Sequence, residues 1–113
     1  MSMETWIPIV DGIRRQMLAV TEHMMQIIVQ LDAGSHLPAH QHPEEQITHM
    51  ISGRLRFTLN GEVLELGPGE SLAIPGGVQH AAEVLEESMA IDTFSPPRQD
   101  MLEQDRAARD NPS

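Results

Sequence analysis

Residues 34–53, GSHLPAHQHPEEQITHMISG, decide the fold of this chain. They place His40 and His42 two residues apart and Gln46 four residues further on, between two glycines. In an extended strand, residues two apart point to the same face, so both imidazoles can direct a nitrogen at one point. Imidazole is the commonest metal-ligating side chain, so this stretch indicates half of a metal site, with an ordinary polar strand face as the alternative.

The composition is that of one acidic domain. With 113 residues, the chain has room for a single hydrophobic core but not for a second module such as a DNA-binding domain. Seventeen acidic residues against seven arginines and no lysine give a formal net charge of -10. This balance argues against nucleic acid and anionic membrane as partners, so an anionic ligand needs a local concentration of positive charge.

Cysteine is absent, which excludes disulfides, thiolate metal ligands and a cysteine nucleophile. The N-terminal residues have no basic region followed by an apolar run, and no segment reaches membrane-spanning length. A soluble cytoplasmic protein is therefore expected.

The pattern along the chain is that of an all-β domain. Apolar residues alternate with polar ones over residues 24–31 and again over residues 54–59. The Asn-Gly pair at residues 60–61 is the strongest short-range hairpin signal, and short strands with regular turns predict a sandwich or barrel. We expect the domain to span residues 1–102, followed by a polar tail at residues 103–113 that is a frayed helix or disordered.

Two pairs of adjacent charged residues are expected to be ordinary surface. Arg14 and Arg15 face opposite ways in a strand and are interpreted as solvated edge charges. Glu44 and Glu45 lie at a turn, where solvation is a simpler account than an acid–base pair.

A second spaced motif occupies residues 69–84, GESLAIPGGVQHAAEV. Gly69 is followed after five residues by Pro75, after one more by Gly77, and after two more by His80. Two independent spaced patterns occur in order, and together they resemble the two-motif signature of the cupin superfamily.

This resemblance implies a single-domain cupin, a small double-stranded β-helix or jelly-roll barrel. It also implies that His40, His42, Gln46 and His80 converge on one divalent metal ion. The chain departs from the usual pattern in having Gln46 where the family usually has Glu and Val84 where Asn is common.

A narrower resemblance covers most of the chain. The segments GIRRQMLAV, HPEEQITHMISGRLRFTLNGE and IDTFSPPRQDML look like the small single-domain cupins of the KdgF type, named for pectin degradation. That family opens the ring of 4,5-unsaturated monouronates, released by pectin and alginate lyases, to linear 4-deoxy-5-keto-uronates. The chain departs from it in having His49 where an aromatic residue is frequent and Glu44 where His is frequent.

The functional Asp, Phe and Arg of that family match Asp92, Phe94 and Arg98 in identity and spacing. Arg98 is the candidate to grip a substrate carboxylate, Asp92 the candidate proton shuttle and Phe94 a wall for the sugar ring. The alternatives are a surface ion pair for Arg98 and plain core for Phe94.

The expected cofactor is one transition metal ion (Ni, Fe, Mn, Zn or Co), because nitrogen-rich ligation suits each of them. The expected partners are a small anionic sugar acid and a second copy of the chain in a homodimer. Other readings are a metal-dependent dioxygenase, a cupin resembling hydroxynitrile lyases, and a non-catalytic sugar-binding cupin. His23, His36 and His49 are expected to lie at the surface or in an interface.

Overall fold

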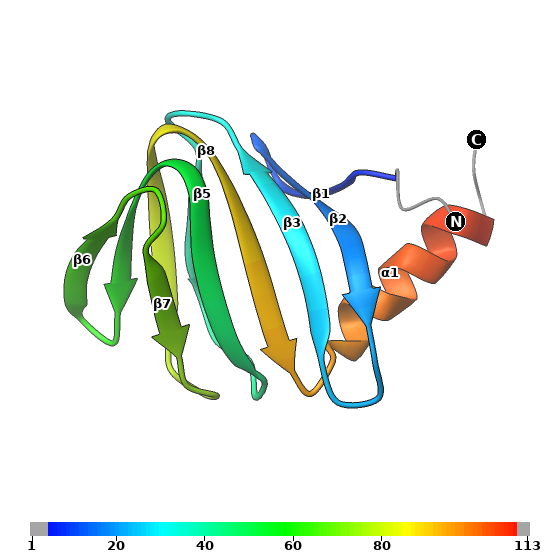
Figure 1. Ribbon diagram of the computed structural model, residues 1–113. Coiled ribbons are helices and arrows are strands. Elements are labelled where there is room, and N and C mark those ends of the chain that lie inside the picture. Colours follow the sequence, from blue (N-terminus) through cyan, green and yellow to red (C-terminus); the bar gives the residue numbers. More distant parts are fainter. Residues whose placement is uncertain (1–4, 111–113) are drawn as a thin grey trace.

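The computed structural model describes residues 5–110, which form eight antiparallel strands and one helix (Figure 1). The elements are β1 (Ile7–Val10), β2 (Ile13–Val20), β3 (Met25–Leu31), β4 (His36–His40), β5 (Glu45–Leu59), β6 (Glu62–Leu66), β7 (Ser71–Ile74), β8 (His80–Ser95) and α1 (Gln99–Asp110). No helix in this described part is long and apolar enough to cross a membrane.

Two long strands, β5 and β8, organise the barrel. They pair with each other from Glu45 opposite Ser95 to Leu59 opposite His80. The first part of β5 and the last part of β8 form one sheet with β7, β3, β2 and β1, whereas their other parts form a second sheet with β6 and β4. The two sheets enclose the core, so the chain is the small all-β jelly-roll barrel that the sequence predicts.

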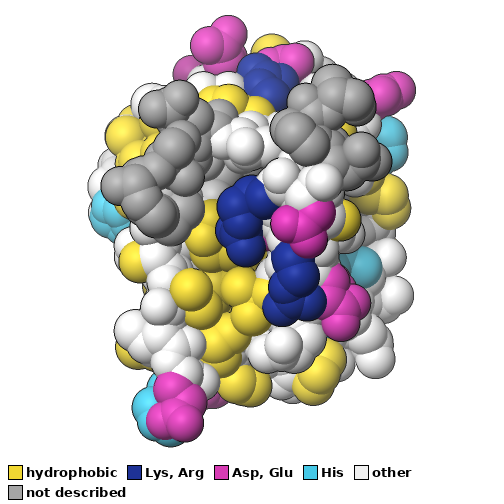
Figure 2. Space-filling model, turned by 90° about the vertical axis from the view of Figure 1, so that its right-hand side faces the viewer, with side chains coloured by type: hydrophobic (Ala, Val, Ile, Leu, Met, Phe, Trp, Pro, Cys, Tyr) yellow, Lys and Arg dark blue, Asp and Glu magenta, His cyan; other side chains and the backbone are white. Residues whose placement is uncertain are grey.

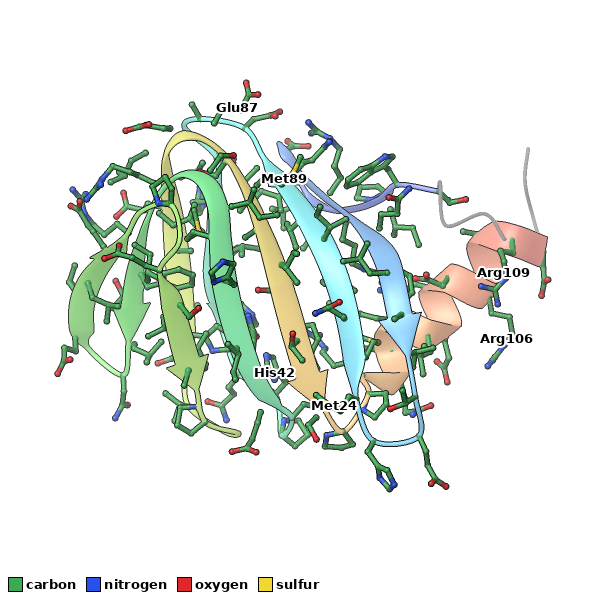
Figure 3. All side chains as sticks on the ribbon, in the orientation of Figure 1. Met24, His42, Glu87, Met89, Arg106 and Arg109 are labelled. Atoms are coloured by element: carbon green, nitrogen blue, oxygen red, sulfur yellow. The ribbon has the colours of Figure 1, made fainter. Side chains whose placement is uncertain are left out.

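The glycine that closes the first motif allows β5 to cross between the sheets. Gly53 has a φ of +86°, and a Cβ at this position would collide with Ser88 Oγ and the carbonyl oxygen of Glu87 on β8. The register between the two strands shifts several times between Met50 and Leu55. Figure 3 shows Glu87 at this end of the barrel, opposite the end that holds His42. Gly53 is therefore required by close backbone approach as well as by its φ.

Local sequence patterns predict the strands and their faces correctly. The alternate residues of β3 from Met25 to Leu31 are buried, as the alternation indicates. Residues 60–61 form the two-residue turn between β5 and β6, with φ values of 47° and 88°. Both values are positive, as a type I′ hairpin turn requires.

The expectation that Arg15 is a solvated edge charge is wrong, and the expected polar tail is part of a helix that begins before it. Arg14 is partly exposed and pairs with Asp32, but Arg15 is 0% exposed, so it is not a solvated edge charge. Residues 99–110 form a helix whose Met101 is buried, and the expected boundary between residues 102 and 103 falls inside this helix. Figure 2 looks onto this side of the molecule, where arginine and acidic side chains lie together over apolar ones.

Candidate metal centre

Three histidines from two strands and a loop meet at one end of the barrel. His40 ends β4 and is the register partner of His80, which begins β8, while His42 lies in the loop after β4. Each histidine offers one ring nitrogen to this point, and the three nitrogens lie within 4.8 Å of one another. The first motif brings two of these nitrogens together locally, and the pairing of β4 with β8 adds the third.

The backbone sets the tautomer of all three imidazoles. Each Nδ1 contacts a carbonyl oxygen two residues away, and a carbonyl oxygen can only accept, so each Nδ1 carries a hydrogen. The three Nε2 atoms of the neutral rings therefore keep their lone pairs. The contacts are His40 Nδ1 to Pro38 O (2.8 Å), His42 Nδ1 to Glu44 O (3.0 Å) and His80 Nδ1 to Val78 O (2.9 Å).

The lone pairs at this centre lack the donors that they need. His80 Nε2 is the one buried side-chain nitrogen or oxygen without a hydrogen-bond partner among residues 5–110. His42 Nε2 lies 3.0 Å from Gln46 Oε1, and both atoms are acceptors when His42 is neutral. Burial lowers the pKa of His80, and the neighbouring His40 and His42 lower it further, so protonation of His80 does not supply the missing charge. A divalent cation among these atoms would satisfy them, so the donor set fits a metal ion.

Gln46 is oriented by a residue that the motif analysis did not single out. Its Nε2 donates to Thr48 Oγ1 at 3.0 Å, which directs Oε1 toward the histidines. Thr48 Oγ1 in turn donates to Asp92 Oδ1 at 2.7 Å. Thr48 lies on the same inward face of β5 as Gln46, so strand alternation could have identified it.

The C-terminal trio Asp92, Phe94 and Arg98 lines the same cavity as His40, His80 and Gln46. Burial raises the pKa of Asp92 to about 6, against the lowering effect of hydrogen bonds from Thr48 and Gln46 and of the Arg98 charge. The sequence left open which influence would prevail, and in the metal-free protein it is burial.

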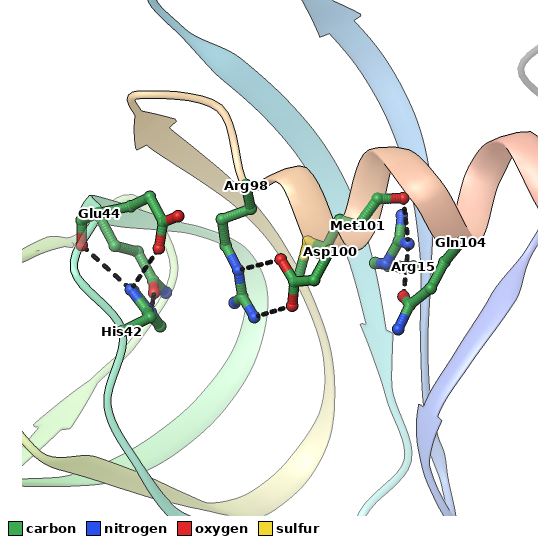
Figure 4. A network of polar contacts seen from close by, with 8 residues as sticks. Arg15, His42, Glu44, Arg98, Asp100, Met101 and Gln104 are labelled. Atoms are coloured by element: carbon green, nitrogen blue, oxygen red, sulfur yellow. Dashed lines mark hydrogen bonds and ion pairs between the residues drawn. The ribbon is translucent and has the colours of Figure 1, made fainter.

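Phe94 and Arg98 pack against each other at the wall of this cavity. The guanidinium carbon of Arg98 lies 5.3 Å from the centre of the Phe94 ring, within the range of a cation–π contact. Arg98 also donates to Asp100, from Nη2 at 2.8 Å and from Nε at 3.3 Å (Figure 4). Arg98 therefore forms the ion pair that the alternative interpretation expects, and it also lines the cavity.

The expectation that Glu44 is solvated is wrong. Its side chain is only 15% exposed, and Oε1 lies 3.5 Å from His42 Nδ1 (Figure 4). Glu45 is exposed, as expected. The other three histidines, His23, His36 and His49, are also exposed.

Comparisons with known proteins agree with this architecture. Residues 27–91 match the family model described as "Cupin domain". The pectin degradation protein KdgF of Dickeya dadantii is 31% identical over 99 residues, which cover 86% of this chain and 90% of that protein.

Solved structures give the same assignment. The structure of KdgF from Halomonas sp. is similar with a TM-score of 0.82 and 36% identity, covering 87% of this chain and 91% of that one. An RmlC-like cupin from Shewanella frigidimarina has a TM-score of 0.81 and 30% identity, covering 86% and 87%. The chain belongs to the cupin family and, within it, to the KdgF type.

Proposed function

We propose that this protein is a metal-dependent enzyme that opens the ring of 4,5-unsaturated monouronates to give linear 4-deoxy-5-keto-uronates. The observation that carries the proposal is one shared cavity, lined both by metal-ligand candidates and by the trio Asp92, Phe94 and Arg98. The similarity to proteins named for pectin degradation supports a uronate as the substrate. An arginine at the cavity wall also suits an anionic sugar better than the apolar substrate expected for a cupin dioxygenase.

The residues that would hold the metal are His40, His42, His80 and Gln46. All four are neutral, so a bound divalent ion keeps its full charge and attracts anions. When bound, the ion supplies Lewis-acid polarisation and orients the substrate. The nitrogen-rich donor set is compatible with each of Ni, Fe, Mn, Zn and Co, and geometry and metal availability decide among them.

Arg98 is proposed to bind the carboxylate of the uronate. Its Nε and Nη2 atoms already contact Asp100, and its face packs on Phe94, so the guanidinium is held in one orientation. The planar fork of a guanidinium matches a carboxylate better than an ammonium group does. We expect Arg98→Lys to raise KM by about tenfold with a smaller effect on kcat, because a point charge remains while the fork is lost.

Asp92 is proposed to move the proton. In the reaction, the anomeric hydroxyl gives its proton to Asp92 as the bond between C1 and the ring oxygen breaks, which leaves an aldehyde at C1 and an enolate at C5. The enolate then takes that proton at C4 and becomes the ketone, so the overall change is an isomerisation that needs no co-reactant. A carboxyl whose pKa is about 6 in the metal-free protein is suited to accept the first proton and deliver the second.

The test is a direct assay of ring opening. Protein loaded with each of the five metals is mixed with 4,5-unsaturated galacturonate, and the loss of the ultraviolet absorbance of the enol ether is followed. We expect a rate well above the spontaneous background, with His80→Ala and Asp92→Asn near that background. His49→Ala is the matched control, since His49 is an exposed histidine whose ring hydrogen-bonds to Ser71 Oγ and which does not line the cavity. A wild-type rate equal to background for every metal would reject the proposal.

A homodimer is proposed as the state in solution. Several large apolar side chains are exposed on or beside the β2–β3–β8–β5 sheet, among them Ile47 and Ile51 on β5 and Met24 in the turn before β3. Met24 and Ile47 line one shallow apolar depression on it. Glu45 is the one charged residue that lines this depression, so for a chain with net charge -10 it is a place where a second copy can approach with little repulsion.

A further inference from the structure

The most deeply buried charge in the described part of the chain is Arg15. It lies on the inward face of β2 between Ile13 and Met17 and is 0% exposed. Within residues 5–110, its guanidinium hydrogen-bonds to acceptors on α1 and to no others, and Figure 4 shows the bonds to Met101 and Gln104. These contacts are Nη1 to Asp105 Oδ1 (2.7 Å), Nη2 to Gln104 Oε1 (2.9 Å) and Nη2 to the carbonyl oxygen of Met101 (3.2 Å).

This cluster fixes the position of the helix. A guanidinium inside a protein is tolerated only when acceptors replace its water, and the acceptors of Arg15 come from a little over one turn of α1. Moving the helix away would leave Arg15 buried without partners. The buried side chain of Met101 adds apolar contact at the same point. In contrast, Arg106 and Arg109 point away from the barrel in Figure 3 and do not hold the helix to it.

The same helix carries a proposed binding residue. The carbonyl oxygen of Arg98 accepts from the N–H of Leu102 at 3.1 Å, so Arg98 stands at the first turn of α1. Met101, one turn further on, lines the cavity and is itself bonded to Arg15. The location of the Arg98 guanidinium therefore follows the location of the helix, because one turn of helix is a short and stiff connection.

The cavity volume shows why the helix matters for a ligand. The cavity has a volume of about 70 Å³, enough for only a few water molecules and too small for a six-carbon sugar acid. Beside it lies a more open cleft of about 280 Å³, which shares His40, Arg98 and Met101 with it. β1, β4 and α1 bound this cleft, and Arg15 also contributes to its wall. A uronate that reaches the histidines must therefore extend into the cleft and lie against α1.

We propose that Arg15 is a positioning residue of the substrate site: it fastens α1 to the barrel and so fixes Arg98 and the cleft wall at the distance that a uronate requires. The inference rests on the proposed function, in which Arg98 binds the substrate carboxylate. Arg15 does not touch the substrate's reacting atoms. Its effect passes through Met101, Gln104 and Asp105 to the first turn of the helix.

A purely structural role would predict a different pattern of effects. Loss of general stability lowers the amount of active protein and leaves KM unchanged. Loss of positioning raises KM while the metal ligands and Asp92, which lie on or beside β4, β5 and β8, keep their geometry and kcat. The split between KM and kcat, together with metal affinity, therefore separates the two roles.

The experiment compares Arg15→Met with Arg14→Met. Arg14 is the neighbouring arginine on the same strand, but its bonds go to Gln30 and Asp32 on the outer face. For Arg15→Met we expect KM for 4,5-unsaturated galacturonate to rise by about tenfold, kcat to stay within about twofold, and metal affinity to stay unchanged. Hydrogen exchange of the α1 amides should become faster in the same variant. Arg14→Met should match wild type in all four measurements.

A milder pair of variants covers the case in which Arg15→Met does not fold. Gln104→Ala removes one acceptor from an exposed helix position, and Glu103→Ala changes the adjacent exposed position without touching Arg15. Alanine favours helix at both sites, so the helix itself is not weakened. We expect Gln104→Ala to raise KM by about threefold and to speed exchange in α1, with Glu103→Ala unchanged. An unchanged KM in Gln104→Ala, or a fall in kcat and metal affinity as large as the rise in KM, would overturn the inference.

Ligand binding without turnover distinguishes failure of the inference from failure of the proposed function. Calorimetry with metal-loaded protein and D-galacturonate, which lacks the 4,5 double bond, measures binding without the proposed reaction. If wild type opens the unsaturated ring but the Arg15 and Gln104 variants bind galacturonate as tightly as wild type, only the inference is wrong. If wild type lacks ring-opening activity, weaker galacturonate binding in these variants still supports the positioning role, and unchanged binding rejects it.

Discussion

His42 Nε2 lies 3.0 Å from Gln46 Oε1, and neither atom carries a hydrogen while His42 donates from Nδ1 to the Glu44 carbonyl. Two lone pairs at this separation repel each other unless a cation lies close to both. The carboxamide is held in this orientation by its bond to Thr48, so the repulsion is built into the site. In the proposed metal site this pair would bind positive charge, at the end of the barrel where His40 and His80 also lie.

Replacement of Gln46 should separate metal affinity from reactivity. We expect Gln46→Glu to bind the metal more tightly but to turn over more slowly, because a carboxylate ligand offsets part of the ion's charge. Gln46→Ala should weaken metal binding by at least about tenfold. Loss of a residue that only hydrogen-bonds to a metal ligand already has about this effect, and Gln46 is proposed as a ligand itself. Competition with a chelator gives the affinities and the ultraviolet assay gives kcat. Equal kcat in Gln46→Glu and wild type would contradict the argument from ligand charge.

We expect His80 to lower the free energy of unfolding of the metal-free protein and to raise that of the metal-loaded protein. It is 4% exposed and its Nε2 has no partner in the described structure, a situation that costs about 1–3 kcal/mol. We therefore expect His80→Leu to raise the free energy of unfolding of the chelator-treated protein by about 1 kcal/mol, after allowing for the lost bond to Val78. Added metal should raise the Tm of wild type but leave that of His80→Leu unchanged. The exposed His49→Leu serves as control and should keep the response to metal.

Asp92 should make the metal-free protein less stable as the pH rises. Its pKa is raised from 3.8 to about 6, so the unfolded chain loses this proton at lower pH than the folded chain does. The free energy of unfolding should fall between about pH 4 and pH 6, by up to about 3 kcal/mol, and then level off. Urea unfolding of wild type and Asp92→Asn across this range isolates the effect, since the other titrating groups are common to both. Equal pH slopes in the two proteins would contradict it.

Thr48 offers a second check on the same carboxyl. Its hydroxyl donates to Asp92 and favours the ionised form. Thr48→Val should therefore raise the pKa of Asp92 further, whereas Thr48→Ser should restore the wild-type value. Carbon NMR of the labelled carboxyl in metal-free protein measures both.

The outer sheet face should hold the dimer together. Ile47 is 50% exposed on β5, and a glutamate there would bring two like charges together in a symmetric interface. We expect Ile47→Glu to be a monomer by light scattering at micromolar concentration, with wild type a dimer. Val63→Glu is the matched control, because Val63 is 59% exposed on β6 in the other sheet. A monomeric wild type would reject the proposed interface.

Local sequence was enough to predict the barrel and the group of side chains at its end. The alternation in β3, the Asn-Gly turn at residues 60–61 and the spacing of the two motifs are short-range signals. The first two depend only on the period of a strand or on the φ that a turn demands. The grouping of His40, His42, Gln46 and His80 is what the resemblance of the two motifs to cupins implies, and the structure brings ring nitrogens of the three histidines within 4.8 Å of one another and Gln46 Oε1 within 3.0 Å of His42 Nε2.

The errors concern residues whose environment comes from distant parts of the chain. Arg15 looks like an edge charge beside Arg14, but its partner Asp105 is ninety positions away. Glu44 looks solvated after Pro43, yet it lies against the His42 ring. The alternation of a strand predicts the face on which a side chain lies. Which residues contact that side chain is decided only when the barrel closes and the helix packs on it.

The sequence by itself determined the ligand spacing, the strand faces and the turns, because these follow from the geometry of a few consecutive residues. The tertiary structure alone decided the charge state and orientation at the site. The closed barrel buries Asp92 beside Thr48, and the docked helix brings Arg98 to the cavity through the buried Arg15. Burial and long-range hydrogen bonds depend on which surfaces the fold brings together, and no local pattern encodes that outcome.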